Sequence, residues 1–281
     1  MIPKGKLLIV GGAERRVREP PDIIEQTNEF ERYEILSELV PHAMNRKIEI
    51  ITTGSEIPEE IGIMYQKTFY ELGYCNVDCL SIQKRTETKK KSILARLEEA
   101  GVIFFSGGDQ FRIATILGGT PFVDIIKSRY LTDNNFVVAG TSAGAMAMSE
   151  VMIMAGGLTE ALIYRNLSTS SGLGLLPSCI IDTHFIKRGR FGRLAHAIIM
   201  NPEKLGVGLG EDTALIITNG FDAECRGSGM VVIIDGRQIT HTNITTVQEG
   251  EPVYVENLKV HLLVKGCHFS LDKRELANPS Q

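Results

Sequence analysis

Short apolar runs recur along the first half of the chain, and several of them end in glycine or a small polar residue. These runs span residues 6–10, 48–53, 77–82, 102–105 and 136–140. Their length and composition are typical of buried strands. The longer segments between them carry apolar residues three and four positions apart, as in residues 58–72, where Pro58 suits a first helical turn. Alternating strands and helices predict an α/β fold with a mostly parallel sheet flanked by helices.

The pattern changes after about residue 219. Apolar and polar residues alternate in short runs at residues 230–235, 236–240 and 252–264, which predicts antiparallel strands. Asp235-Gly236 is a candidate hairpin turn. Because no linker rich in proline or serine comes before these runs, we expect residues 219–281 to form a β-rich C-terminal part of a single α/β domain spanning residues 1–281.

Composition narrows the possible classes of function. The 281 residues carry a formal net charge of −4, without the basic surplus of a nucleic-acid-binding protein. No stretch reaches the roughly 20 apolar residues of a membrane-spanning helix, and the N-terminal stretch lacks the apolar region of a signal peptide. Five cysteines without metal-type spacing favour reduced thiols. We expect a cytoplasmic protein with no nucleic-acid or membrane partner.

The segment VVAGTSAGAM, residues 137–146, ends an apolar run in small residues around one serine. Within it, residues 140–144 match the G-x-S-x-G nucleophile elbow, between a predicted strand and a helix-compatible run. The glycines would let the helix pack closely on the strand, and the Ala143 N–H could stabilise an oxyanion beside Ser142. A strand–helix turn with an incidental serine is the alternative. Gly11-Gly12 and Gly107-Gly108 also follow strands and are candidate walls of the same site.

A serine nucleophile needs a base to take its proton and an acid to orient that base. His184 ends the apolar run at residues 179–184, where a strand would bring it to the same edge as Ser142. A buried core histidine is the alternative. Glu211 and Asp212 lie between two apolar runs, and we favour Glu211 as the orienting acid, with Asp212 left open.

Three arginines follow the histidine, at positions 188, 190 and 193. Forked guanidinium groups beside a candidate base suggest carboxylate recognition. An exposed, charged first turn of a helix is the alternative.

Five segments together resemble the cyanophycinases, of the dipeptidase-E-like clan of serine peptidases. They are GGAE at 11–14, SGGDQ at 106–110, AGTSAGAM at 139–146, IDTHFIKRGRFGRL at 181–194 and GVGLGEDTAL at 206–215. The likeness spans nearly the whole chain, and the His–Arg segment is its most specific part. It implies a fold like that of class I glutamine amidotransferases and a homodimer. It also implies hydrolysis of cyanophycin, a polyaspartate with arginine on each β-carboxyl, to β-Asp-Arg dipeptides.

The resemblance also implies roles for individual residues. Ser142 would be the nucleophile, His184 the general base and then acid, and Glu211 the orienting acid. The N–H groups of Gly108 and Ala143 would form the oxyanion hole. The implied substrate-binding residues are Gln110, Asp182, Thr183, Arg188, Arg190 and Arg193. We expect no metal or cofactor, because serine, imidazole and backbone N–H groups suffice for acyl transfer.

One position departs from the family pattern. The family commonly has Asp-Gln-His where this chain has Asp182-Thr183-His184. The missing amide leaves open a related dipeptidase that acts on other aspartyl or isoaspartyl peptides. A catalytically inactive binding homologue is a further alternative, although the complete set of Ser142, His184 and Glu211 argues against it. A glutamine amidotransferase would carry cysteine in place of the serine.

Overall fold

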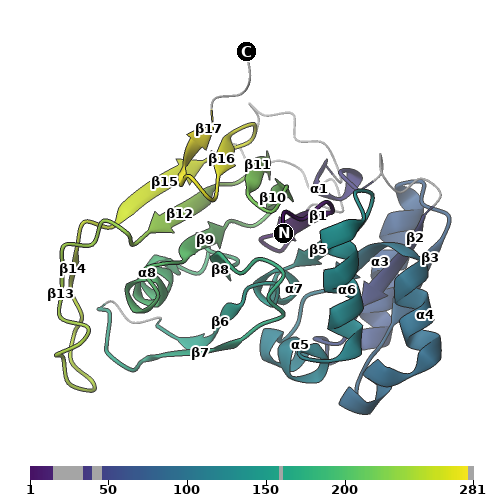
Figure 1. Ribbon diagram of the computed structural model, residues 1–281, viewed down its shortest axis with the longest axis horizontal. Coiled ribbons are helices and arrows are strands. Elements are labelled where there is room, and N and C mark those ends of the chain that lie inside the picture. The colour runs from purple at the N-terminus through teal and green to yellow at the C-terminus, as the bar shows by residue number, and fades with distance from the viewer. Residues whose placement is uncertain (15–33, 40–45, 158–160, 278–281) are drawn as a thin grey trace.

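Two β-sheets, one of nine strands and one of four, form the frame of the molecule (Figure 1). The computed structural model describes residues 1–14, 34–39, 46–157 and 161–277. The large sheet carries helices on both faces, and the small sheet lies beside its antiparallel half (Figure 1).

The large sheet has a parallel half and an antiparallel half. The parallel strands are β1 (Lys6–Val10), β2 (Lys47–Ile51), β3 (Val77–Leu80), β4 (Ala100–Phe105) and β5 (Val137–Thr141). The antiparallel strands are β10 (Thr213–Thr218), β11 (Asp222–Gly227), β16 (His268–Ser270) and β17 (Glu275–Ala277). The order β17-β16-β11-β10-β1-β5-β4-β2-β3 places β1 and β5 at the centre.

Helices cover both faces of the parallel half because its strands are apolar on both sides. The helical segments are α1 (Glu34–Ser37), α3 (Pro58–Glu71), the 3₁₀ helix η1 (Arg85–Lys89), α4 (Lys91–Glu99), α5 (Gln110–Leu117) and α6 (Pro121–Thr132). Alternate residues of β1 enter two cores. Leu7 joins the core under α4 and α6, whereas Leu8 joins the core under α3.

The small sheet has the order β15-β12-β9-β8. Its strands are β8 (Cys179–Asp182), β9 (Leu205–Leu209), β12 (Val231–Asp235) and β15 (Lys259–Leu263). Helix α8 (Phe191–Met200) packs against it. A Cβ on Gly206 would lie 2.9 Å from Ile198 Cγ1, so the close packing of helix and strand depends on this glycine.

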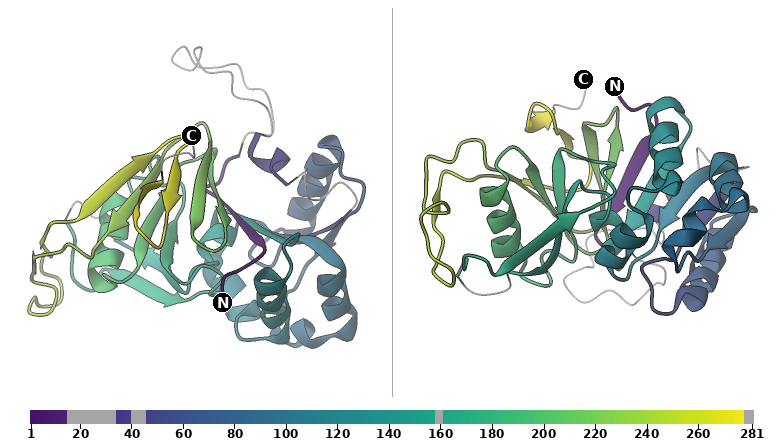
Figure 2. Two further views of the ribbon diagram at one scale, coloured as in Figure 1. Left: turned by 45° about the horizontal axis from the view of Figure 1, so that its top comes forward. Right: turned by 60° about the horizontal axis from the view of Figure 1, so that its bottom comes forward.

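Two short ribbons complete the described chain. One pairs β6 (Val151–Gly156) with β7 (Leu167–Ser171), and the other pairs β13 (His241–Thr242) with β14 (Val255–Glu256). Figure 2 shows from two further sides that the β13–β14 ribbon lies at the outer edge of the molecule.

The predicted α/β fold, with flanking helices and added C-terminal strands, is confirmed. The strand predicted at 236–240 and the hairpin at Asp235-Gly236 are wrong. Neither residue has the positive φ that a type I′ turn requires. The Asp235 carboxylate instead accepts a hydrogen bond from the Arg237 N–H (3.0 Å), and the chain returns to pair with Asp235 only at Lys259. Residues 236–258 therefore form a long connection that carries the β13–β14 ribbon.

Candidate active site

The sharp turn after β5 is built from small residues because larger ones would not fit. Ser142 stands between β5 and helix α7 (Ala143–Met146), with φ 52° and ψ −119°. A Cβ on Gly140 would lie 2.7 Å from the Gly144 carbonyl carbon, and one on Gly144 would lie 2.3 Å from the Phe105 oxygen. The G-x-S-x-G spacing thus allows the turn to pack against β4 and presents one hydroxyl at its apex.

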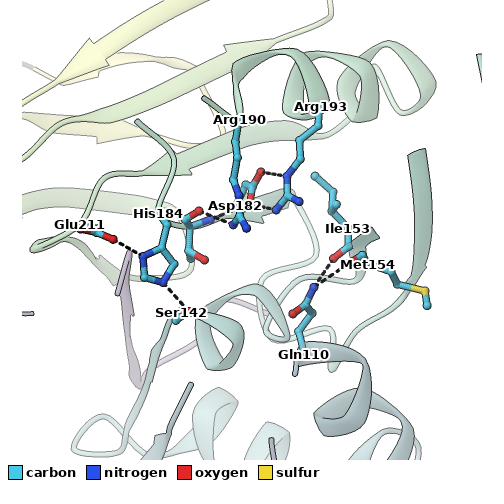
Figure 3. Close-up of polar contacts among 10 residues, drawn as sticks. Gln110, Ser142, Ile153, Met154, Asp182, His184, Arg190, Arg193 and Glu211 are labelled. Atoms are coloured by element: carbon cyan, nitrogen blue, oxygen red, sulfur yellow. Dashed lines mark hydrogen bonds and ion pairs between the residues drawn. The ribbon is translucent and has the colours of Figure 1, made fainter. Parts of the chain in front are cut away.

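His184 lies directly beside this serine. Ser142 Oγ is 2.9 Å from His184 Nε2, and His184 Nδ1 is 2.7 Å from Glu211 Oε1 (Figure 3). In this arrangement Nδ1–H donates to the carboxylate, which leaves Nε2 to accept the serine proton. The three side chains therefore have the geometry of a nucleophile, a base and an orienting acid.

His184 comes from the small sheet, whereas Ser142 comes from the large one. His184 follows β8, and its N–H donates to the Gly11 oxygen at the end of β1 (2.9 Å). Gly12, with φ +95°, lies against the ring: a Cβ there would be 2.5 Å from His184 Nε2. The Gly-Gly pair that ends β1 therefore joins the two sheets at the site.

Glu211 lies in the turn between β9 and β10, and each of its carboxylate oxygens has a partner. Oε1 faces His184, and Oε2 accepts a hydrogen bond from Lys187 Nζ (2.9 Å). Burial raises the pKa of Glu211, but the hydrogen bonds from Lys187 and His184 outweigh it, and the net shift is downward. Asp212 bonds the Ser228 hydroxyl instead (2.6 Å). Glu211, rather than Asp212, therefore contacts the histidine.

Two backbone N–H groups lie free beside the serine. Gly108 has φ +130°, and a Cβ there would lie 2.1 Å from the Gly54 oxygen. Across the described part of the chain, neither the Gly108 N–H nor the Ala143 N–H has a protein acceptor. Both follow ends of parallel strands, β4 and β5, where ligands bind in open sheets. They are available to a developing oxyanion.

The three predicted arginines have different surroundings. Asp182, fully buried at the end of β8, holds two of them (Figure 3). Arg193 grips it with two donors, including Nε to Oδ2 at 2.6 Å, and Arg190 Nη1 donates to Oδ1 at 3.1 Å. Asp182 therefore pairs with Arg190 and Arg193 inside the protein. Arg188 is exposed and is available to an external ligand.

Several polar groups near this cluster have unused hydrogen-bonding capacity. Arg190 Nε and Thr183 Oγ1 are buried, and neither has a partner within the described residues. Gln110, at the start of α5, donates its side-chain amide to the Ile153 and Met154 oxygens (3.0 and 3.2 Å; Figure 3). Its amide oxygen lies on the same side as the serine in that view. Arg190 Nε and Thr183 Oγ1 are therefore unsatisfied polar groups inside the protein, next to the Asp182 ion pairs.

Two residues of the site were not singled out from the sequence. Glu14, only 5% exposed, accepts hydrogen bonds from the hydroxyls of Thr141 (2.8 Å) and Tyr65 (2.6 Å). It thereby anchors the residue before the serine to α3. Lys187, the partner of Glu211, is the other. A carboxylate two residues after the Gly-Gly of a buried strand was a usable signal for Glu14, whereas nothing distinguished Lys187 from other surface lysines.

Neither a metal centre nor a membrane span is found in the described ranges. No group of three or more His, Cys, Asp or Glu side chains there could hold a metal ion. No helix of those ranges is long and apolar enough to cross a membrane.

Comparison with known proteins gives consistent matches. The profile of Peptidase family S51 matches residues 23–222. A cyanophycinase from Trichormus variabilis is 36% identical over 273 residues, which are 96% of this chain and 87% of that protein. A cyanophycinase from Synechococcus elongatus is 34% identical over 270 residues, which are 95% of this chain and 80% of that protein. A solved peptidase from an acI-B1 Actinobacterium shares the fold, with a TM-score of 0.63 at 21% identity over 96% of this chain and 97% of that one.

Proposed function

The chain belongs to peptidase family S51, and on this premise we propose that it is a serine-type exopeptidase that hydrolyses cyanophycin to β-Asp-Arg dipeptides. The observation that carries the proposal is the unbroken hydrogen-bonded series from Ser142 Oγ through His184 to Glu211. The likeness to curated cyanophycinases over 95–96% of the chain supports the choice of substrate.

In the proposed acylation step, Ser142 Oγ attacks the scissile carbonyl carbon while His184 Nε2 takes the hydroxyl proton. The carbonyl oxygen becomes an oxyanion that accepts hydrogen bonds from the Gly108 and Ala143 N–H groups. Glu211 holds Nδ1–H and stabilises the imidazolium. The tetrahedral intermediate then expels the amine, which receives the proton from Nε2, and an acyl-enzyme remains on Ser142.

Deacylation repeats these roles with water as the nucleophile. His184 Nε2 removes a proton from the water as its oxygen attacks the acyl carbon. The same two N–H groups stabilise the second oxyanion. Ser142 Oγ leaves with the proton that Nε2 returns, and the new carboxylic acid is released. This chemistry needs only groups of the chain itself, so we propose that no metal or cofactor takes part.

We propose that the substrate is recognised by the residues that the family resemblance implies, some by direct contact and others by holding their neighbours in place. These residues are Gln110, Asp182, Thr183, Arg188, Arg190 and Arg193. The exposed Arg188 and Arg190 Nη2, which has no acceptor among the described residues, would bind substrate carboxylates directly. Asp182 and Arg193 would act mainly by holding Arg190 and its neighbours in place. Thr183, where the family commonly has glutamine, offers a hydroxyl in place of an amide.

We also propose a homodimer in the cytoplasm. The cytoplasmic location is supported by the five cysteines, all of which are free thiols. Size-exclusion chromatography with light scattering would test the dimer, which a mass near that of one chain would contradict.

Incubation with purified cyanophycin, followed by mass analysis of the released products, tests the function. β-Asp-Arg dipeptide should accumulate as the main product. Release of free arginine instead, or no release from cyanophycin alongside cleavage of short isoaspartyl peptides, would contradict it and favour the related dipeptidase.

A further inference from the structure

A second concave site lies at the far end of α8 from the catalytic serine. It is a cavity of about 860 Å³ between the C-terminal end of α8 and the connection that carries the β13–β14 ribbon. Its apolar wall includes Met200, Ile239 and Ile244, and its charged lining is Glu203, Arg237 and Arg274. A volume of this size is in the range of small-molecule sites.

The arginines of this cavity are fixed by a buried carboxylate. Asp235, 2% exposed, accepts a hydrogen bond from Arg274 Nη1 (2.6 Å) and two from Arg237, through Nε (3.4 Å) and Nη2 (3.3 Å). Burial raises the pKa of Asp235, but hydrogen bonds from Arg237 and Arg274 outweigh this, so the net shift is downward and the carboxylate is ionised. The two guanidinium groups are therefore held in place before any ligand arrives.

One charge of each sign remains unpaired at the cavity. Asp235 neutralises one of the two arginines. Arg237 has a half-exposed side chain, and its Nη1 has no acceptor among the residues that the structure describes. The exposed carboxylate of Glu203 likewise has no ion-pair partner in that part of the chain. A ligand that carries one carboxylate and one guanidinium on an aliphatic stem would complement this lining.

The cavity is separate from the proposed catalytic site. Arg190, which bonds Asp182 beside the catalytic histidine, precedes α8, whereas Met200 ends it. Ten residues of helix separate them by about 15 Å. In Figures 1 and 2 the β13–β14 ribbon lies at the outer edge of the molecule, beyond α8 from β5. About five residues of an extended polyaspartate backbone would cover the 15 Å.

We propose that this cavity is a second binding site for the polymer, taking an arginyl group outside the unit being cleaved. The proposal rests on the proposed function. An arginine joined through its α-amino group keeps a free carboxylate, for Arg237, and a guanidinium, for Glu203. Its methylene stem would lie over the apolar wall. A chain held at two sites stays near the catalytic serine between cleavage events, which lowers the apparent KM for long polymers without changing the chemical step.

The test compares long cyanophycin with a substrate of two β-Asp-Arg units, which is too short to reach the cavity. In Arg237→Gln/Glu203→Gln, KM for the long polymer should rise about five- to tenfold with kcat unchanged. Kinetics on the short substrate should stay within about twofold of wild type. The matched control is Lys90→Gln/Glu87→Gln, which removes an ion pair (3.1 Å) at η1, among residues that do not line the cavity, and should leave both substrates unaffected.

An unchanged KM for the polymer, or an equal rise for both substrates, would overturn the second site. The proposal would also be overturned if the double variant raised the inhibition constant of the β-Asp-Arg product and left KM for the polymer unchanged. The cavity would then bind free dipeptide and not the polymer. Co-sedimentation of Ser142→Ala with cyanophycin, with and without the two glutamine substitutions, separates this proposal from the function itself. Weaker co-sedimentation of the triple variant supports the cavity even if wild type cleaves neither substrate, and equal co-sedimentation contradicts it.

Discussion

Ser142 and His184 both have backbone conformations that non-glycine residues rarely adopt, with φ of 52° and 50°. Such conformations cost about 1–3 kcal/mol each and persist where the surrounding structure enforces them. The Ser142 N–H is held by the Val10 oxygen (3.0 Å), and the His184 N–H by the Gly11 oxygen (2.9 Å). Two successive carbonyls at the end of β1 thus fix both residues, which accounts for a precise serine–histidine distance between residues of different sheets.

The choice between Glu211 and Asp212 can be tested directly at the residue scale. Glu211→Gln removes the charge that stabilises the His184 imidazolium, so kcat should fall about 100-fold or more with little loss of secondary structure. Asp212→Asn changes a neighbour that bonds Ser228 and should keep kcat within about threefold of wild type. Steady-state kinetics on cyanophycin decide between them. The opposite ranking would assign the orienting role to Asp212.

Gly12 offers a second residue-scale test. A Cβ there would overlap the His184 ring at 2.5 Å, so Gly12→Ala should displace the imidazole and lower kcat about 100-fold. Gly73→Ala is the matched control, since Gly73 has φ +89° but open space around it. Both variants should lose about 1–2 kcal/mol of stability from the positive φ, and only Gly12→Ala should lose activity. Equal kcat in the two variants would show that the ring tolerates the added methyl group.

At the scale of elements, the sequence predicted where strands lie but not which strands pair with each other. The five strands predicted in the first half lie within two residues of the observed ends, because period and turn residues are local signals. No local sequence signal predicts that β8 pairs with β9 in a separate sheet. The same is true of the ion pairs that Asp182 makes with Arg190 and Arg193, here called the Asp182 clamp. The serine motif could be recognised because its G-x-S-x-G spacing is itself a local pattern. One part of its steric reason is local, since Gly140 packs on Gly144, and the other is not, since Gly144 packs on Phe105 of β4.

The Asp182 clamp predicts that two of the arginines differ in what they support. Arg193→Lys loses the double hydrogen bond to a buried carboxylate and should lower the free energy of unfolding by about 2–3 kcal/mol. Arg188→Lys should leave stability unchanged and reduce kcat/KM on cyanophycin by about 1–3 kcal/mol of transition-state stabilisation. Urea unfolding and steady-state kinetics measure the two effects. Full stability in Arg193→Lys with a loss of kcat/KM would mean that Arg193 binds substrate.

Helix α8 contains a buried histidine that predicts acid sensitivity. His196 is 1% exposed, both ring nitrogens lack a partner in the described structure, and burial lowers its pKa. At acidic pH the folded state therefore binds fewer protons than the unfolded state. The stability that neutral His196 contributes is fully present above the unfolded pKa of about 6.5 and is lost as the pH falls below that value.

Between pH 7 and pH 5, His196→Leu should lose less stability than wild type, by at most about 2 kcal/mol. The control is Leu194→Ala, which truncates a buried side chain of the same helix that does not titrate, so it should lower stability by the same amount at both pH values and keep the wild-type pH dependence. Unfolding free energies at the two pH values provide the comparison. The same pH dependence in wild type and His196→Leu would show that another group controls the acid limit.

At the scale of the whole molecule, the proposed catalytic residues belong to both sheets. Ser142 follows β5 of the large sheet, His184 follows β8 of the small one, and Glu211 lies in the turn that links them. Buried residues of both sheets, such as Ile103 and Ile233, also belong to one hydrophobic core. These features support our proposal of a single hydrolytic domain over residues 1–281, since separation of the sheets would divide both the core and the site.

The most direct test of the central claim, acyl transfer by Ser142, is the rate of dipeptide release from cyanophycin by wild type and Ser142→Ala. Without the nucleophile, only substrate binding and the two oxyanion N–H groups remain, and kcat should fall at least about 1,000-fold. Unchanged circular dichroism and melting temperature would show that the fold is intact. Release by Ser142→Ala within about tenfold of wild type, a difference of only 1.4 kcal/mol, would contradict the account.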